Sequence, residues 1–268
     1  MLTEVFLGIA ILAIVLPVAW MLVLAVQPAK NIVSGDWQFG FSLSNLQSLF
    51  AFGQPFATQY VNSIIIVAGT VVLCLLVGTL AGYSLASLGW SPKMTAALLA
   101  VAAIIPVVPP MAMVPGLYST LQNLGLLGSI PGLIMLNTVF NLPFTVVLMK
   151  VYFGSVPVEL REAALIDGAS ELLTFRKVML PVVAPGAAAA AIYTAIMTWN
   201  EFLFGLTMTS GGTTSPITVG IAALVQPYEA KWGEMAAAGS ITAIPIILLA
   251  IIARRRIVTG MTRGAVKG

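Results

Sequence analysis

Six apolar runs, each about as long as a bilayer is thick, most strongly limit what this chain can fold into. A helix needs about 20 predominantly apolar residues to cross the hydrocarbon core. Only 8% of the 268 residues are charged, whereas a soluble domain carries about 25%. The sequence therefore predicts an all-α polytopic membrane protein, a single transmembrane domain over residues 1–268. Its six spans are expected at about Val5–Val26, Asn62–Leu85, Thr95–Pro115, Ile130–Val151, Val182–Leu206 and Met235–Ala253.

The first apolar run is predicted to be a retained span. A secretory signal has a short apolar region preceded by basic residues. Here the run is longer, and the residues before it include Glu4 but no Lys or Arg.

Positive charges predict the orientation, because cytoplasmic loops are enriched in Lys and Arg. With a cytoplasmic N-terminus, only Lys30 and Lys231 of the 12 basic residues fall outside. We therefore expect a multi-pass protein of the bacterial cytoplasmic membrane with both termini inside. The ten inside cations are Lys93, Lys150, Arg161, Arg176, Lys177, Arg254, Arg255, Arg256, Arg263 and Lys267.

The composition argues against several classes of function. The chain has no His, and Cys74 is its only cysteine, so a metal cluster or an intrachain disulfide is not expected. No basic block with interleaved aromatics suggests nucleic acid. No paired carboxylates lie within the spans, so a membrane enzyme is disfavoured, and no cofactor bound by this chain is expected.

Prolines and glycines mark the spans. Pro106, Pro109, Pro110 and Pro115 crowd the third span, where each removes a backbone donor and kinks or interrupts a helix. Such breaks occur where a helix bends to pack or where it lines a cavity, and both interpretations stay open.

Gly78 and Gly82 are spaced for close helix packing, within this subunit or against a second one.

Glu201 is the only acidic residue within the core of a predicted span. An ionisable group at membrane depth usually faces a polar interior, which makes it a functional candidate. The alternative is that its carboxylate reaches the outer interface. At helical spacing it would share a face with Tyr193, Met197, Asn200 and Phe204.

The segment after the fourth span concentrates charge between two apolar runs. Pro157 is suited to begin a helix that continues over 158–167, and Gly168 fits the position just past its end. This short amphipathic helix is expected to have nothing of its own protein to bury against. Docking into a partner and lying on the membrane surface both remain open.

The same segment, "EAALIDGASELLTFRKVMLP", resembles the EAA loop of ABC-importer transmembrane subunits. The matching positions are Glu162, Ala163, Ala164, Gly168, Leu180 and Pro181, with Val178 at the usual Ile position. "NSIIIV", "AGYSLAS", "WNE" and the tail "RRRIVTGMTRGAVKG" extend the resemblance over nearly the whole chain. Together they resemble the carbohydrate branch, of the maltose-permease G type, although Ser87 stands where that family usually has Arg.

The resemblance implies an ABC importer type I permease fold with a cytoplasmic coupling loop at about 152–181. In such subunits the loop seats in an ATPase subunit, which binds ATP and Mg. The resemblance assigns ATPase coupling to seven residues: Glu162, Ala163, Ala164, Asp167, Gly168, Leu180 and Pro181. It also implies that Gly264, Ala265, Val266, Lys267 and Gly268 contact the ATPase dimer. From the residues alone, the segment 257–268 after the three arginines should be flexible.

The leading hypothesis is a permease subunit for a di- or oligosaccharide, with glycerol-phosphate-type solutes as the alternative. The implied partners are a second homologous permease, the ATPase dimer, an extracytoplasmic solute-binding protein, membrane lipid and the sugar. The chain lacks a phosphate-binding Gly-x-x-x-x-Gly-Lys-Ser/Thr loop and is not expected to hydrolyse ATP. An ion-coupled secondary transporter is disfavoured, because Glu201 is the only candidate coupling group. The translocation path is predicted to include Asn137, Asn141, Tyr193, Trp199, Asn200 and Glu201.

Overall fold

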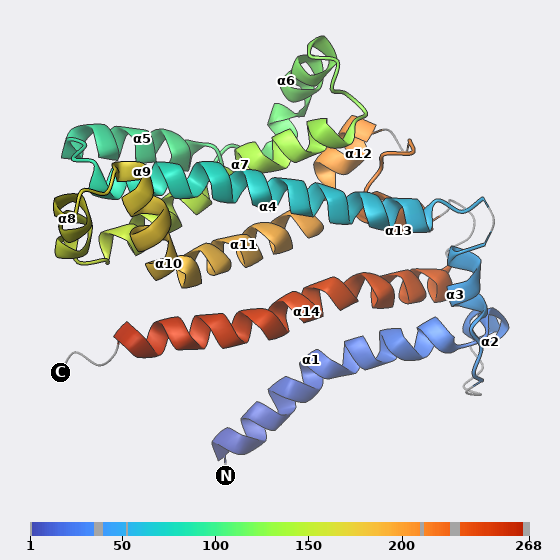
Figure 1. Ribbon diagram of the computed structural model, residues 1–268. Helices are drawn as coiled ribbons and strands as arrows, with labels where there is room; N and C mark the ends of the chain where they lie inside the picture. Colours follow the sequence, from blue (N-terminus) through green and yellow to red (C-terminus); the bar gives the residue numbers. More distant parts are fainter. Residues whose placement is uncertain (1, 35–39, 52, 210–211, 226–230, 265–268) are drawn as a thin grey trace. The chain divides into compact units, whose positions relative to one another are not determined.

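The computed structural model describes residues 2–34, 40–51, 53–209, 212–225 and 231–264. Within these ranges every element is a helix (Figure 1), which confirms the predicted all-α class. Four of the described helices are long and apolar enough to cross a membrane: α1 (Leu2–Val26), α4 (Phe56–Ser87), α7 (Ile130–Gly154) and α14 (Trp232–Gly264). These correspond to the first, second, fourth and sixth predicted spans.

The fifth predicted span is a broken helix. The predicted span, Val182–Leu206, contains α11 (Ala184–Trp199), and the broken helix starts before it with α9 (Glu171–Thr174), the π-helical segment η1 (Phe175–Met179) and α10 (Leu180–Val182). The two halves meet at a bend of 76° beside Val183 and count as a fifth span if taken together. A separate short helix, α12 (Leu203–Thr209), follows, so a single helix over Val182–Leu206 is not formed.

The third predicted span is divided in the same way. Helix α5 (Pro92–Ile104) has 13 residues, and α6 (Pro110–Asn123) begins after a five-residue break. The break contains Pro106 and Pro109, which cannot donate helical hydrogen bonds. The prolines thus interrupt the helix, as predicted, and α5 alone is shorter than a straight crossing requires. The count of six spans stays a prediction.

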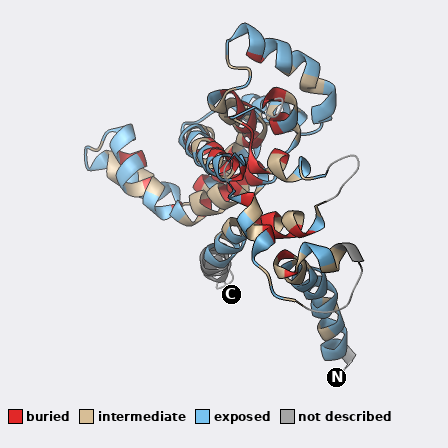
Figure 2. Ribbon diagram, turned by 90° about the vertical axis from the view of Figure 1, so that its right-hand side faces the viewer, coloured by how far each residue is buried: buried red, intermediate tan, exposed pale blue. Residues whose placement is uncertain are grey.

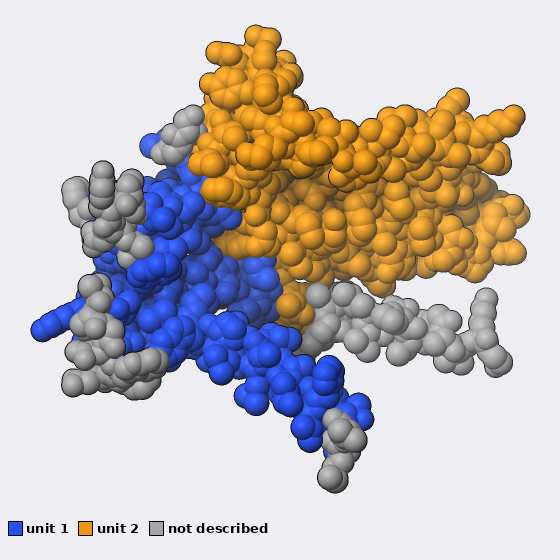
Figure 3. Space-filling model, turned by 180° about the vertical axis from the view of Figure 1, so that it is seen from behind, with its two compact units in different colours: residues 1–62, 211–247 blue, residues 63–210, 248–268 orange. Residues whose placement is uncertain are grey.

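The described residues form two compact units (Figure 3). The first unit, Met1–Asn62 with Gly211–Ile247, contains α1, α2 (Ala29–Ser34), α3 (Ser44–Leu49) and α13 (Ile217–Ala222). Asn45 on α3 donates to the backbone oxygens of Leu24, Ala25 and Gln27 at 3.3, 3.3 and 2.8 Å. These bonds satisfy carbonyls at the end of α1 and join it to α3. Most side chains of α1 itself are exposed (Figure 2).

The second unit, Ser63–Ser210 with Leu248–Gly268, packs α4, α7 and α11 through small residues. A Cβ added at Gly82 of α4 would lie 2.6 Å from the Cβ of Met149 on α7, and Gly78 meets Thr145 in the same way. Gly186 of α11 lies directly against the ring of Tyr152. The predicted close packing is therefore confirmed, and it occurs within this subunit.

Candidate functional site

The charged segment after α7 forms a well-defined helix. Helix α8 spans Val158–Ile166, with Pro157 just before it. Gly168 has a φ of +85°, which most residues avoid and glycine accepts readily. Its N–H donates to the Leu165 carbonyl at 3.1 Å, closing the helix as a C-terminal glycine cap does. The predicted helix and its glycine end are confirmed.

Helix α8 packs against its own protein, contrary to expectation. Its Arg161 donates through Nε and a terminal nitrogen to the two carboxylate oxygens of Glu171, at 2.9 and 2.7 Å. Glu171 is the first residue of α9, whose N-terminus is capped by Ser170. The Tyr83 hydroxyl of α4 donates to the same carboxylate. These three residues, the Tyr83–Glu171–Arg161 triad, connect α8, α9 and α4.

The triad has a defined electrostatic and packing environment. The Glu171 carboxylate raises the pKa of Arg161, so the guanidinium stays charged at any ordinary pH. The Tyr83 ring is buried, with its centroid 5.2 Å from that of Phe153 and 5.0 Å from that of Phe175. Tyr83 therefore belongs to a hydrophobic cluster that includes Met149, Phe153, Phe175, Met179, Val183 and Ala190. The position of α8 is fixed by the core of the second unit.

The residues assigned to ATPase coupling divide into two groups. Glu162, Ala163, Asp167 and Gly168 are exposed on α8 and its end, whereas Ala164 is half-buried. Leu180 packs against the hydrophobic cluster, and Pro181 beside it is exposed. One part of the motif thus forms an exposed surface on α8, and Leu180 belongs to the core that holds the bent span.

The outward surface around α8 also carries apolar side chains. Ile166 is 85% exposed, Leu172 62% and Val158 57%. The same segment carries the exposed carboxylates of Glu162 and Asp167, and exposed apolar side chains beside polar ones are typical of protein or membrane contacts. Partner docking and lying on the membrane surface therefore both stay open.

Two of the residues predicted for the translocation path are buried in the second unit. Asn137 and Asn141 of α7 are buried, and each side chain donates to the backbone carbonyl four residues earlier, at 2.9 and 2.8 Å. Thr145 continues this row, and its hydroxyl lies 3.4 Å from that of Thr194 on α11. The row places polar groups between α7 and α11. Whether solute reaches it stays a prediction.

The other predicted path residues lie on or after α11. Tyr193 is half-buried, its ring centroid 3.8 Å from that of Phe144, and Trp199 is buried. Asn200 is exposed and donates to the Ile196 carbonyl at 2.8 Å, at the end of α11. The helix ends there, so the shared helical face predicted through Phe204 is not formed.

Glu201 has a structural role that the sequence did not indicate. Its carboxylate accepts hydrogen bonds from the backbone N–H groups of Phe204 and Gly205, at 2.7 and 3.1 Å. These groups open α12, so Glu201 caps that helix, where a negative charge is favourable. The half-buried carboxylate therefore lies between two helices and not within one continuous helix.

The predicted ATPase-contacting tail is only partly described. Helix α14 continues through Arg254, Arg255 and Arg256 to Gly264. The segment 257–264 is thus helical, and the expectation of a flexible segment there is wrong. A long helix extends easily because each added residue gains one hydrogen bond. Ala265, Val266, Lys267 and Gly268 lie outside the described residues.

Comparison with known proteins agrees with this architecture. The family model for the binding-protein-dependent transport system inner membrane component matches residues 75–263. The chain is 33% identical over 256 residues to the trehalose transport system permease protein SugB of Mycobacterium tuberculosis, covering 94% of this chain and 92% of that protein. It is 32% identical over 260 residues to the diacetylchitobiose uptake system permease protein NgcG of Streptomyces coelicolor, covering 94% and 83%.

A solved structure has a similar fold. A chain in the crystal structure of a bacterial ABC transporter involved in the import of the acidic polysaccharide alginate superposes with a TM-score of 0.80, at 21% identity, covering 95% of this chain and 94% of that one. The helices, the ordered loop and these likenesses define a multi-pass membrane permease. The chain belongs to the family of binding-protein-dependent transport system inner membrane components.

Proposed function

We propose that this chain is the permease subunit of an ATP-driven importer that translocates a di- or oligosaccharide delivered by a solute-binding protein. The relatives named above transport trehalose and diacetylchitobiose. The observation that carries the proposal is the exposed surface of α8, held to the membrane core by the Tyr83–Glu171–Arg161 triad. Because α8 is ordered, exposed and connected to the membrane helices, a movement of a bound partner would be transmitted to them.

The ATPase would be a separate dimer that binds ATP and Mg, and this chain would bind no cofactor. Conformational changes of the ATPase would act on Glu162, Ala163 and Gly168 on the exposed side of α8. They would pass through the ion pair to α9 and, along the bent segment, to α11. Rigid elements with two discrete arrangements can carry such coupling. Alternating access of the path between this chain and a second permease would follow.

This function sets the orientation. The loop that contains α8 would face the cytoplasm, in agreement with the charge count, and both termini would lie on that side of the bacterial cytoplasmic membrane. The tail Gly264–Gly268 would reach the ATPase dimer. Asn137, Asn141, Tyr193, Trp199, Asn200 and Glu201 would line or support the path on its permease side.

The test is to purify the tagged chain from its native membrane and to reconstitute the complex. We expect an ATPase to copurify and radiolabelled trehalose or maltose to accumulate only with ATP and binding protein. Ala163→Trp, a bulky change at an exposed position of α8, should reduce ATPase copurification. Ala51→Trp, the same change at an exposed position of the first unit, should leave it unchanged. Failure of an ATPase to copurify with the unmodified chain would refute the proposal.

A further inference from the structure

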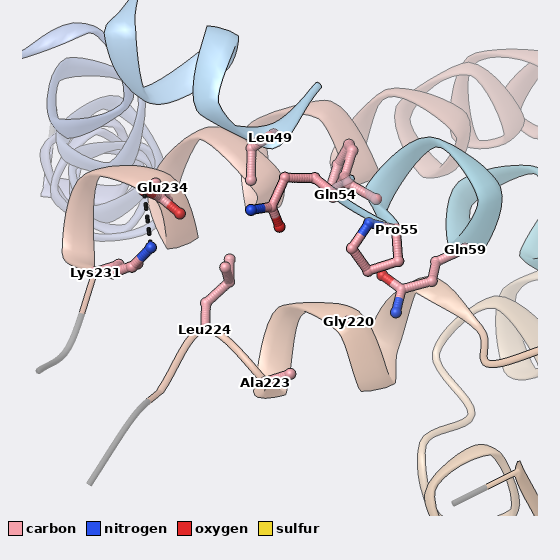
Figure 4. A pocket seen from close by; sticks show the side chains of 10 residues that line it. Leu49, Gln54, Pro55, Gln59, Gly220, Ala223, Leu224, Lys231 and Glu234 are labelled. Carbon is pink, nitrogen blue, oxygen red and sulfur yellow. Dashed lines mark ion pairs between the residues drawn. The ribbon is translucent and has the colours of Figure 1, made fainter. Parts of the chain in front are cut away.

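A cavity of about 280 Å³ lies within the first unit, between the end of α3, the start of α4, α13 and the start of α14 (Figure 4). The proposed orientation places this unit's connecting segments on the outer side of the membrane. Its lining residues include none from α8 and none predicted for the translocation path. Its apolar wall includes Leu49, Phe56 and Leu224.

The walls of this cavity are fixed by side-chain contacts. Asn45 of α3 bonds the end of α1 and lies directly against Gly233 of α14. Asn62 of α4 donates to the carbonyls of Thr213 and Ser215 before α13, at 2.8 and 3.1 Å. These buried amide contacts join the segments that surround the cavity. A preformed cavity of this kind loses little entropy when it takes up a ligand.

Gln59 of α4 is the polar group that points to a ligand. Its residue is 7% exposed, and it lines the cavity while packing against Gly220. An amide that lines a cavity presents both a donor and an acceptor to whatever enters it, so Gln59 suits a ligand that can both donate and accept.

The other polar groups define the ligand's charge. Gln54 adds a second amide to the cavity lining, next to Leu49, and Lys231 and Glu234 form an ion pair at 3.4 Å (Figure 4). Because the two charges compensate each other, the cavity does not favour an anion such as a phosphate or a uronic acid. Amides and a paired ammonium and carboxylate instead suit hydroxyl groups, which donate and accept at once.

We propose that this cavity is an outer subsite for one neutral sugar ring of the transported solute. Ordinary ligand pockets measure about 300–1,000 Å³, so a cavity near the lower limit holds a single ring and not a whole oligosaccharide. The apolar wall would receive the C–H face of the ring, while the amides of Gln54 and Gln59 bind its hydroxyls. The proposal rests on the proposed function, since it deepens the substrate class of that importer.

The test uses the assembled complex in lipid nanodiscs, without the solute-binding protein, titrated with trehalose and, separately, glucose 6-phosphate by saturation-transfer NMR. Trehalose should bind saturably and more tightly than glucose 6-phosphate. Gln59→Leu and Gln54→Leu should each weaken trehalose binding about fivefold or more, the effect of one lost hydrogen bond. Gln54 is exposed, so its replacement does not disturb a core. Gln47→Leu, at an exposed amide of α3 that does not line the cavity, is the matched control.

Several results would overturn the proposal. They are equal trehalose affinity in the wild type and both cavity variants, no saturable binding by the wild type, or preference for glucose 6-phosphate. A variant that loses stimulation by the binding protein while keeping its trehalose affinity would assign the cavity to a protein segment instead. ATP-driven trehalose uptake by the wild-type complex separates the two proposals. Uptake without cavity binding refutes only the subsite, and absence of uptake for any sugar refutes the function as well.

Discussion

Replacing Glu171 with Gln tests whether the triad holds α8 in place. The substitution keeps the size of the side chain and one oxygen acceptor, but it removes the charge that pairs with Arg161. In the wild type this carboxylate receives two guanidinium hydrogen bonds, at 2.9 and 2.7 Å, and one from the Tyr83 hydroxyl. Its loss should loosen α8 from α9 and α4 without changing the hydrophobic cluster beneath.

The expected magnitude follows from the exposure of the pair. The Arg161 side chain is 19% exposed and the Glu171 side chain 37%, so water screens the interaction in part. Exposed ion pairs contribute about 0.2–1 kcal/mol, and removing one partner of a fully buried pair costs about 3–5 kcal/mol. With bidentate geometry and partial exposure, Glu171→Gln should cost about 1–2 kcal/mol of local stability.

Amide hydrogen exchange of the segment 158–174, measured by mass spectrometry on the assembled complex, reports this loss directly. A cost of about 1–2 kcal/mol increases the open population and the exchange rate roughly 5- to 30-fold. Glu159→Gln is the control, since it makes the same charge change at an exposed position of α8. Adding Arg161→Gln to Glu171→Gln should have little further effect, because the two residues act as one unit.

Exchange that rises less than twofold in Glu171→Gln would refute the idea that the ion pair positions α8. An equal increase in Glu159→Gln would also count against it, because general loss of negative charge would then explain the result. Normal exchange together with lost uptake would show that Glu171 acts in some other way.

Two further substitutions test the backbone at the end of α8 and the packing of α4. Gly168→Val forces a β-branched residue into a φ of +85°, which costs about 1–2 kcal/mol. Amide exchange in 158–174 should accelerate, and ATP-driven uptake should fall. Normal values of both would contradict the role of this turn. Gly82→Ala places a Cβ 2.6 Å from that of Met149, an overpacking that costs about 1–3 kcal/mol. Thermal unfolding in detergent should occur at lower temperature for Gly82→Ala than for the control Gly116→Ala, which meets nothing within 4 Å; equal midpoints would refute tight packing there.

Local patterns in the sequence were sufficient for much of the fold. Four apolar runs became helices close to their predicted bounds, because a long apolar segment in lipid satisfies its backbone only as a helix. The helix of the charged loop and its ending at Gly168 were also predictable. Both depend on hydrogen bonds and dihedral preferences within a few neighbouring residues.

The sequence misjudged the places where the chain leaves a regular helix. The apolar run after α10 predicted one helix through Leu206, but α11 ends at Trp199 and Glu201 begins a new helix by capping it. Hydropathy does not distinguish these outcomes, because both keep the segment apolar. The sequence around Glu201 is equally compatible with an interfacial carboxylate and with a helix cap.

The lipid environment, the all-α class and the short helix of the charged loop all follow from local sequence patterns. The partners of the loop's charges depend instead on how distant segments pack. Arg161 and Glu171 are ten positions apart, and Tyr83 is 88 positions from Glu171. No helical period relates them, and they meet only because the packing of α4, α7 and η1 brings their backbones together. Contacts of this kind depend on the whole core, whereas helices depend on neighbours along the chain.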